Sequence, residues 1–331
     1  MNLSEVIGKA RAVACRQHLA LSTEKSYLHW IRMYAAWLQS TRPTESEARL
    51  KVEAFLSAEA RRGVSAGTQN QAFCALLFLY RSVLGVELGN VDALRAKQQI
   101  HERHAPTREE VAALLGSLRD LSGYPTRLIV HLIYGCGLRV NEPLSLRIKD
   151  VDLPASRLTI RDPKHGHDRV VSLPCSVVPW VKRQMEVALE THAADVRDRI
   201  PVVLPGLLAK KYPRAVYDRG WTWLFPQLRP CRHPRTGETV RWHCLDQTVQ
   251  RAVRAAAKTA GLSCIITPHH LRHAYATHAL RSGASPRDIQ AVLGHRSLET
   301  TMGYLHAEAS RVISPLESLD VSSVPAGAKV S

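Results

Sequence analysis

Apolar side chains recur every three or four positions in three segments of the first 95 residues, the spacing typical of amphipathic helices. The first of these segments has Ser22 or Thr23 as a candidate N-cap. The predicted helices cover residues 21–38, 46–61 and 67–84. We expect residues 1–95 to form an all-helical domain, followed by a linker at about 96–106.

The pattern changes in the second part of the chain, residues 107–316. Two short runs with alternating apolar residues, 157–161 and 169–173, predict a β-hairpin with Lys164 near its tip. Helical patterns lie on both sides, at 108–119, 125–136, 176–194, 246–260, 268–282 and 286–293. The predicted fold class is α+β: a helical first domain, and a mostly helical second domain with a small antiparallel β-sheet. The tail at 317–331, rich in Ser, Pro and Gly, is expected to be disordered.

Local signals mark where several of these helices begin and end. Thr107 and Glu110 form a capping box at the start of the helix from 108. Thr267 precedes a proline at the first position of the next-to-last helix, and Ser285 does the same for the last. Gly294 follows the last helix as its stop signal.

Length, charge and cysteine use narrow the class of protein. The chain has 331 residues and a formal net charge of +16, so we expect two domains and a polyanionic partner, with nucleic acid the leading candidate. A hydrophobic fraction of 45% excludes a disordered basic tail. No apolar stretch approaches the length of a membrane span and no leader pattern begins the chain, which predicts a cytoplasmic protein without a membrane partner. Seven scattered cysteines predict reduced thiols.

The block at about 200–245 is rich in Pro, Gly, Trp and Arg and has the character of an insertion. Cys231, His233, His243 and Cys244 suggest a zinc site, but their spacing fits no common zinc motif, and adjacent His-Cys ligands are geometrically awkward. We therefore predict no metal.

Six candidate catalytic residues occur in order along the second domain: Arg139, Lys164, His269, Arg272, His295 and Tyr304. Each alone has an ordinary structural explanation. Together, the segments GCGLRVNE (135–142), HHLRHAYATHAL (269–280) and LGHRSLETTMGY (293–304) resemble the motifs of the tyrosine recombinases. The resemblance implies a tyrosine recombinase fold, in which the helical first domain and a catalytic domain clamp DNA.

The chemistry of phosphoryl transfer explains these residue types. Arginine forks and an imidazole stabilise charge on the nonbridging oxygens of a phosphodiester, a role that the resemblance assigns to Arg139, Arg272 and His295. It makes Tyr304 the nucleophile, which forms a 3′-phosphotyrosyl intermediate without metal or cofactor. It makes Lys164 the acid for the departing 5′ hydroxyl, while His269 orients or deprotonates the tyrosine.

The block at 200–245 is similar to the extra block of integron integrases. This resemblance implies a homotetramer that exchanges strands between a duplex site and a folded single-stranded hairpin site, whose protruding bases contact Trp221, Pro234 and His243. Stacking on an aromatic side chain suits an unpaired base. Two residues depart from the pattern: Cys244, where a second histidine is usual, and Pro143, which could bend the helix behind Arg139.

Three other functions remain open at this point. A general tyrosine recombinase or phage-type integrase would act on duplex sites and would not need the extra block. A type IB topoisomerase would share the phosphotyrosine chemistry without joining two sites. A catalytically silent DNA-binding protein would tolerate loss of Tyr304.

Overall fold

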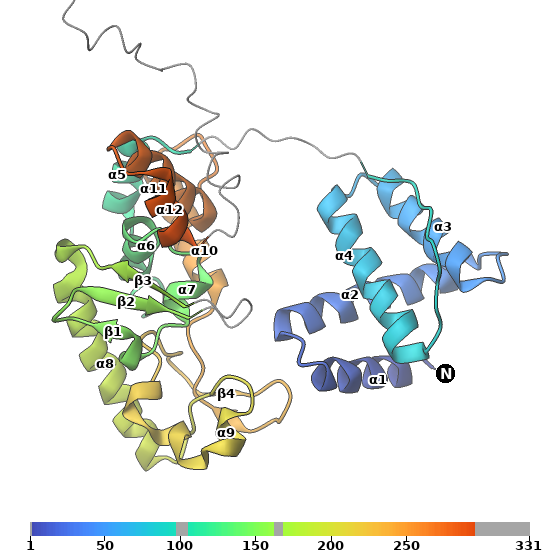
Figure 1. Cartoon of the computed structure of the whole chain (residues 1–331), viewed down its shortest axis with the longest axis horizontal. Helices are drawn as coiled ribbons and strands as arrows, with labels where there is room; N and C mark the ends of the chain where they lie inside the picture. Colours follow the sequence, from blue (N-terminus) through green and yellow to red (C-terminus); the bar gives the residue numbers. More distant parts are fainter. Residues whose placement is uncertain (1, 97–104, 162–167, 295–331) are drawn as a thin grey trace, which may run out of the picture. The chain divides into compact units, whose positions relative to one another are not determined.

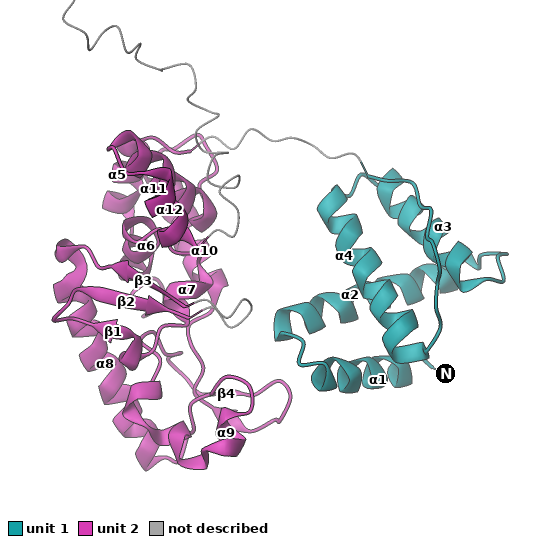
Figure 2. Cartoon of the chain, viewed as in Figure 1, with its two compact units in different colours: residues 1–103 teal, residues 104–331 magenta. Residues whose placement is uncertain are grey.

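The computed structural model describes residues 2–96, 105–161 and 168–294. The chain divides into two units, residues 1–103 and 104–331, each with its own hydrophobic core (Figure 2). The predicted tail and most of the predicted linker lie outside the described residues.

Unit 1 is helical throughout its regular structure (Figure 1). Its elements are α1 (Leu3–Arg16), α2 (Leu21–Thr41), α3 (Ala48–Arg61), α4 (Ala66–Leu77) and a π-helical segment, η1 (Phe78–Leu84). The three predicted helices are confirmed, with the third divided between α4 and η1. Their apolar faces meet around Tyr34 and Phe55, which pack edge to face with ring centroids 5.2 Å apart. The hydroxyl of the buried Tyr34 side chain makes a 2.9 Å hydrogen bond with the Tyr80 hydroxyl.

Two details of unit 1 differ from the sequence prediction. Helix α1 was not predicted, although Asn2 and Glu5 form a capping box that marks its start. The proposed cap of α2 is wrong, because the helix begins one residue before Ser22 and its N-cap is Ala20, which makes no side-chain capping bond. Burial of the α2 face against α4 therefore stabilises this helix without a cap.

Unit 2 packs helices around a small antiparallel sheet. The helical elements that precede the sheet in the chain are α5 (Arg108–Ser117), α6 (Thr126–Gly135), α7 (Asn141–Leu144) and η2 (Ile148–Asp150). The strands of the sheet are β1 (Val151–Asp152), β2 (Arg157–Ile160) and β3 (Arg169–Ser172). After it come η3 (Cys175–Val177), α8 (Val178–Arg197), α10 (Asp246–Thr259), α11 (Pro268–Arg281) and α12 (Pro286–Leu293). The predicted hairpin strands pair, with Leu158 opposite Val171. The predicted caps of α5, α11 and α12 are confirmed.

The block at 200–245 forms α9 (Leu208–Lys211), η4 (Pro213–Tyr217), η5 (Arg219–Trp221) and a two-stranded sheet of β4 (Cys231–Arg232) and β5 (Thr239–Val240). Part of the block belongs to the main core of unit 2, where Leu224, Phe225 and Cys244 are fully buried. The buried Arg241 guanidinium makes two hydrogen bonds to the Asp195 carboxylate, 2.5 and 2.7 Å long. These contacts anchor the block to α8. Among the described helices, none has both the length and the apolar character needed to cross a bilayer.

Candidate active site

Two of the six predicted catalytic residues, Arg139 and Arg272, meet at one carboxylate in unit 2. Glu142 Oε1 accepts a 3.0 Å hydrogen bond from Arg139 Nη1, and Glu142 Oε2 accepts a 2.8 Å bond from the Arg139 backbone N–H. Arg272 Nη1 lies 3.6 Å from Glu142 Oε2. The structure therefore brings together residues 133 positions apart in the chain around an acidic residue that sequence reasoning did not single out.

A third arginine, Arg169 of β3, makes the closest contact with this carboxylate. Its two terminal nitrogens donate to the two oxygens of Glu142 at 3.0 and 2.7 Å. Burial acts to raise the pKa of Glu142, but the hydrogen bonds and charge of Arg169, helped by Arg139 and Arg272, hold this pKa below its usual range. One carboxylate and three guanidinium groups leave a surplus of positive charge, which suits a phosphodiester.

The two predicted arginines differ in their surroundings. Arg272 is buried and donates to the carbonyl oxygens of Gly137 at 2.8 Å and Leu293 at 2.6 Å. The Arg139 side chain is 47% exposed. Arg272 is thus held by the end of α12 and by the turn after α6, while Arg139 can reach a ligand from solvent.

The turn that presents Arg139 depends on Gly137. This residue has φ of +63°, the left-handed region that glycine adopts without strain. A Cβ at this position would also lie 2.5 Å from the Tyr275 ring of α11. Pro143 lies in the first turn of α7, where a helix needs no backbone donor, and Arg139 keeps its hydrogen bonds to Glu142. Pro143 therefore fits the start of α7 and leaves the contacts that hold Arg139 in place.

Three of the six predicted residues lie outside the described residues: Lys164, His295 and Tyr304. The chain on either side of the predicted hairpin tip is described. Arg161 donates to Asp150 at 3.0 Å and to Asp168 at 2.6 Å, so one guanidinium joins the two arms of the hairpin. His269 is exposed in the first turn of α11, three positions before Arg272.

The residues predicted to contact protruding bases have different surroundings. Trp221 is half-buried, with the Lys149 ammonium 2.9 Å from its ring centroid. His243 is half-buried and lies edge-on to Trp223, with centroids 5.0 Å apart, and burial lowers the pKa of this imidazole. Pro234 is exposed between β4 and β5.

Cys244, the departure noted in the sequence, points into the core, where burial raises the pKa of its thiol to about 11. The Cys244 side chain therefore offers no exposed surface to a ligand. Over residues 2–96, 105–161 and 168–294 there is no group of three or more His, Cys, Asp or Glu side chains that could hold a metal ion.

Comparison with known proteins identifies the family. The sequence matches the phage integrase family over residues 106–311 and the phage integrase N-terminal SAM-like domain over residues 8–90. An integrase/recombinase of Escherichia coli is 38% identical over 310 residues, 91% of this chain and 90% of that protein. Tyrosine recombinase XerA of Thermococcus onnurineus (strain NA1) is 30% identical over 280 residues, 83% of each chain.

Solved structures share the fold. The integrase of transposon Tn1549, in complex with transposon right end DNA, aligns with a TM-score of 0.58 and 16% identity over 94% of this chain and 99% of that chain. XerH site-specific recombinase, bound to its palindromic difH substrate, aligns with the same TM-score and 20% identity over 91% of this chain and 81% of that chain. The α+β fold expected from the sequence is therefore confirmed. The chain belongs to the phage integrase family and is a tyrosine recombinase, an enzyme that cleaves and rejoins DNA strands.

Proposed function

We propose that this recombinase is of the integron-integrase type. It would insert and excise gene cassettes by exchanging strands between a duplex site and a folded single-stranded hairpin site. It would act as a homotetramer, with residues 1–95 as the domain that clamps DNA and 107–316 as the catalytic domain. The observation that supports this proposal is an aromatic pocket in the block at 200–245.

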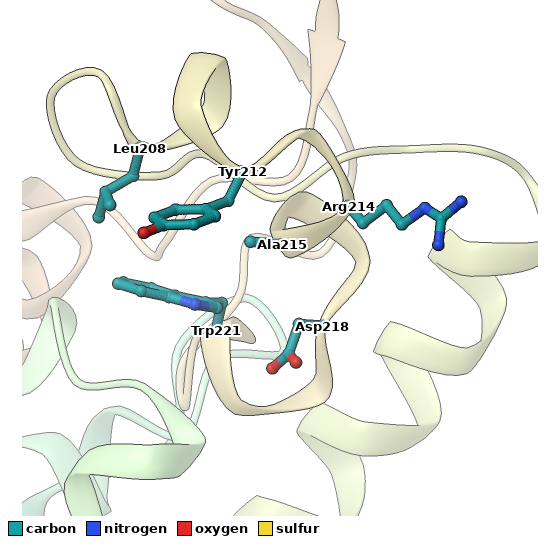
Figure 3. Close-up of a pocket in the computed structure, with 6 residues that line it drawn as sticks. All are labelled: Leu208, Tyr212, Arg214, Ala215, Asp218 and Trp221. Atoms are coloured by element: carbon teal, nitrogen blue, oxygen red, sulfur yellow. The ribbon is translucent and has the colours of Figure 1, made fainter.

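The pocket has a volume of about 420 Å³ and opens to solvent between two aromatic side chains. Figure 3 shows the Tyr212 and Trp221 rings facing each other across it, with Leu208 at its edge and Arg214 directed away. An unpaired base has two π faces and gains about 1 to 3 kcal/mol from stacking on an aromatic ring. A base held within an intact duplex cannot enter such a pocket.

Two cationic side chains, Arg147 and Lys149, contact Trp221. Arg147 Nη1 donates to the Trp221 carbonyl oxygen at 2.5 Å, and the Arg147 guanidinium stacks over the Trp223 ring, 3.5 Å from its centroid. Lys149 lies over the Trp221 ring itself. A ring held by such contacts loses less freedom on binding, so its contact area contributes more efficiently to affinity.

The proposed reaction assigns one role to each catalytic residue. The Tyr304 oxygen forms a bond to phosphorus while the 5′ oxygen leaves with a proton from Lys164, and His269 orients or deprotonates the tyrosine. Arg139, Arg272 and His295 stabilise the charge on the nonbridging oxygens. Attack by the 5′ hydroxyl of the other site then releases Tyr304 and joins the new strand.

The nucleophile can be tested by covalent trapping. A nicked oligonucleotide, selected from a random-sequence library for capture by the wild-type chain, should become linked to the protein through a 3′ phosphate. Tyr304→Phe should bind the same oligonucleotide and form no adduct, because the attacking oxygen is missing. An adduct with the Phe variant would assign the nucleophile to another residue.

The integron assignment is tested by comparing hairpins. Trp221→Ala should weaken binding to a hairpin with protruding bases by about 1 to 3 kcal/mol. Binding of the same variant to plain duplex, which depends on Lys and Arg contacts to phosphate, should hardly change. The measurement is a titration at one salt concentration, with thermal melts to verify folding.

Trp180→Ala is the matched control, because Trp180 is a 38% exposed tryptophan on α8, outside the block. It should leave both affinities unchanged. Equal loss of hairpin and duplex binding in Trp221→Ala would contradict the integron assignment. So would a wild-type affinity that does not depend on the protruding bases. Either result would favour a general site-specific recombinase acting on duplex sites.

A further inference from the structure

Arg169 joins two segments of unit 2 that lie far apart in the sequence. Its Nε donates to the carbonyl oxygen of Val292 near the end of α12 at 2.6 Å, while its terminal nitrogens hold the carboxylate of Glu142. The turn after α12 lies directly against the same side chain, because a Cβ at Gly294 would be 3.3 Å from Arg169 Cδ. One planar guanidinium thus bridges α7 and the end of α12.

Both segments make hydrogen bonds with proposed catalytic residues. Glu142 accepts hydrogen bonds from Arg139, and Leu293 O accepts one from Arg272. His295 is the residue after Gly294 in the chain. Arg169 also begins strand β3, the return arm of the hairpin that contains Lys164, directly after the ion-paired Asp168.

Arg169 itself is poorly placed to touch DNA. Its side chain is 11% exposed, and its charge is matched by a carboxylate that is 12% exposed. The two terminal nitrogens donate to a carboxylate while Nε donates to a carbonyl oxygen, a set of contacts that requires the rigid, planar guanidinium of arginine. Lysine has only a single nitrogen and cannot make all three contacts.

We infer that Arg169 is a positioning residue for strand cleavage. It holds Glu142, and through it Arg139, at a set distance from the α12 end that holds Arg272. The inference rests on the catalytic roles proposed above for Arg139 and Arg272. Misplacing catalytic groups by about 1 Å can cost about 100-fold in rate.

The test is Arg169→Lys, which keeps the charge and loses the fork. Arg183→Lys is the matched control, because Arg183 Nη1 also pairs with a glutamate, Glu186, at 3.0 Å but on the exposed surface of α8. The substrate is the nicked oligonucleotide selected for capture by the wild-type chain. Single-turnover rates of covalent capture are measured beside the dissociation constant for the same DNA.

Arg169→Lys should slow capture by about 10- to 100-fold with little change in the dissociation constant, while Arg183→Lys should match the wild type. A second substrate has a methylphosphonate at the cleaved position, which removes the charge that Arg139 and Arg272 would stabilise. On it, the slowing by Arg169→Lys should be smaller. A purely structural defect would slow capture of both substrates equally.

Glu142→Gln gives an independent measurement and replaces Arg169→Lys if that variant does not fold. Since both residues act through one contact, the double variant should be no slower than the slower single variant. A capture rate for Arg169→Lys near that of the wild type, equal slowing on both substrates, or additive effects would overturn the inference. A wild-type chain that captures no DNA would instead refute the proposed catalytic function, and this inference with it, before any variant is compared.

Discussion

At the scale of single residues, Arg139 and Arg272 share a proposed role but not an environment. Arg272 is buried among the carbonyl oxygens of Gly137 and Leu293, with Glu142 nearby. Arg139 is half exposed, and its guanidinium is held by the Glu142 carboxylate. A preorganised guanidinium stabilises developing charge without reorganising, whereas an exposed one can follow the phosphate as it enters.

Because their environments differ, we expect substitutions of the two arginines to change the free energy of unfolding by different amounts. Arg139→Ala and Arg272→Ala should both abolish covalent capture. Arg272→Ala should also lower the free energy of unfolding by about 2 to 4 kcal/mol, because it leaves two buried carbonyl groups without their donor. Arg139→Ala should change it by less than about 1 kcal/mol. Chemical denaturation measures both, and equal losses would contradict the difference in environment.

At the scale of elements, the turn between α6 and α7 is shaped by its contact with α11. Gly137 combines a left-handed backbone with a side-chain neighbour, Tyr275, that leaves no room for a Cβ. The turn can therefore approach α11 closely enough for Arg272 to reach the Gly137 carbonyl oxygen. The close approach of this turn to α11 therefore accounts both for how the two elements are arranged and for where Arg139 and Arg272 lie.

Gly137→Ala should destabilise unit 2 by about 3 kcal/mol or more, because backbone strain and overpacking add. Gly261→Ala is the matched control: its φ of +66° is similar, but nothing lies within 4 Å of a Cβ there. That variant should lose only about 1 kcal/mol, the cost of the left-handed backbone. Equal unfolding midpoints for the two variants would contradict the proposed role of the Tyr275 contact.

At the scale of the whole molecule, the two units have separate cores and different buried titratable groups. Burial lowers the pKa of four histidines in unit 2: His192, His233, His243 and His278. Each has a folded pKa below its unfolded value of about 6.5, so the unfolded state binds more protons in mild acid. The stability these groups contribute is present above about pH 6.5 and is lost as the pH falls.

Unit 2 should therefore lose stability between pH 7.5 and 5.5. Hydrogen exchange, analysed as protection factors for peptides of α10 and α11, follows unit 2 separately from unit 1. His243→Asn should reduce the loss, because one group that must be protonated on unfolding is removed. Unchanged protection of these peptides at pH 5.5 would contradict the burial of the four histidines.

The sequence by itself determined most of the helices, the sheet and the family, although α1 and the N-cap of α2 were missed. Caps such as Thr107 with Glu110, and Ser285 before α12, depend on residues three positions apart, so they can be found without the fold. Strands β2 and β3 follow from alternation and a short turn. The ordered motifs around Arg139, Arg272 and Tyr304 indicated the recombinase family because their residues and spacing resemble those of the tyrosine recombinases.

Only the tertiary structure decided which residues support the site. Glu142 meets Arg169 across 27 positions, and Gly137 meets Arg272 across 135, distances that no local pattern encodes. The same holds for the pocket between Tyr212 and Trp221 and for the burial of Cys244 beside the half-buried His243. Contacts of this kind arise when separate elements bury their apolar faces together, so a single sequence predicts the elements but not the partners they bring to a shared carboxylate or cavity.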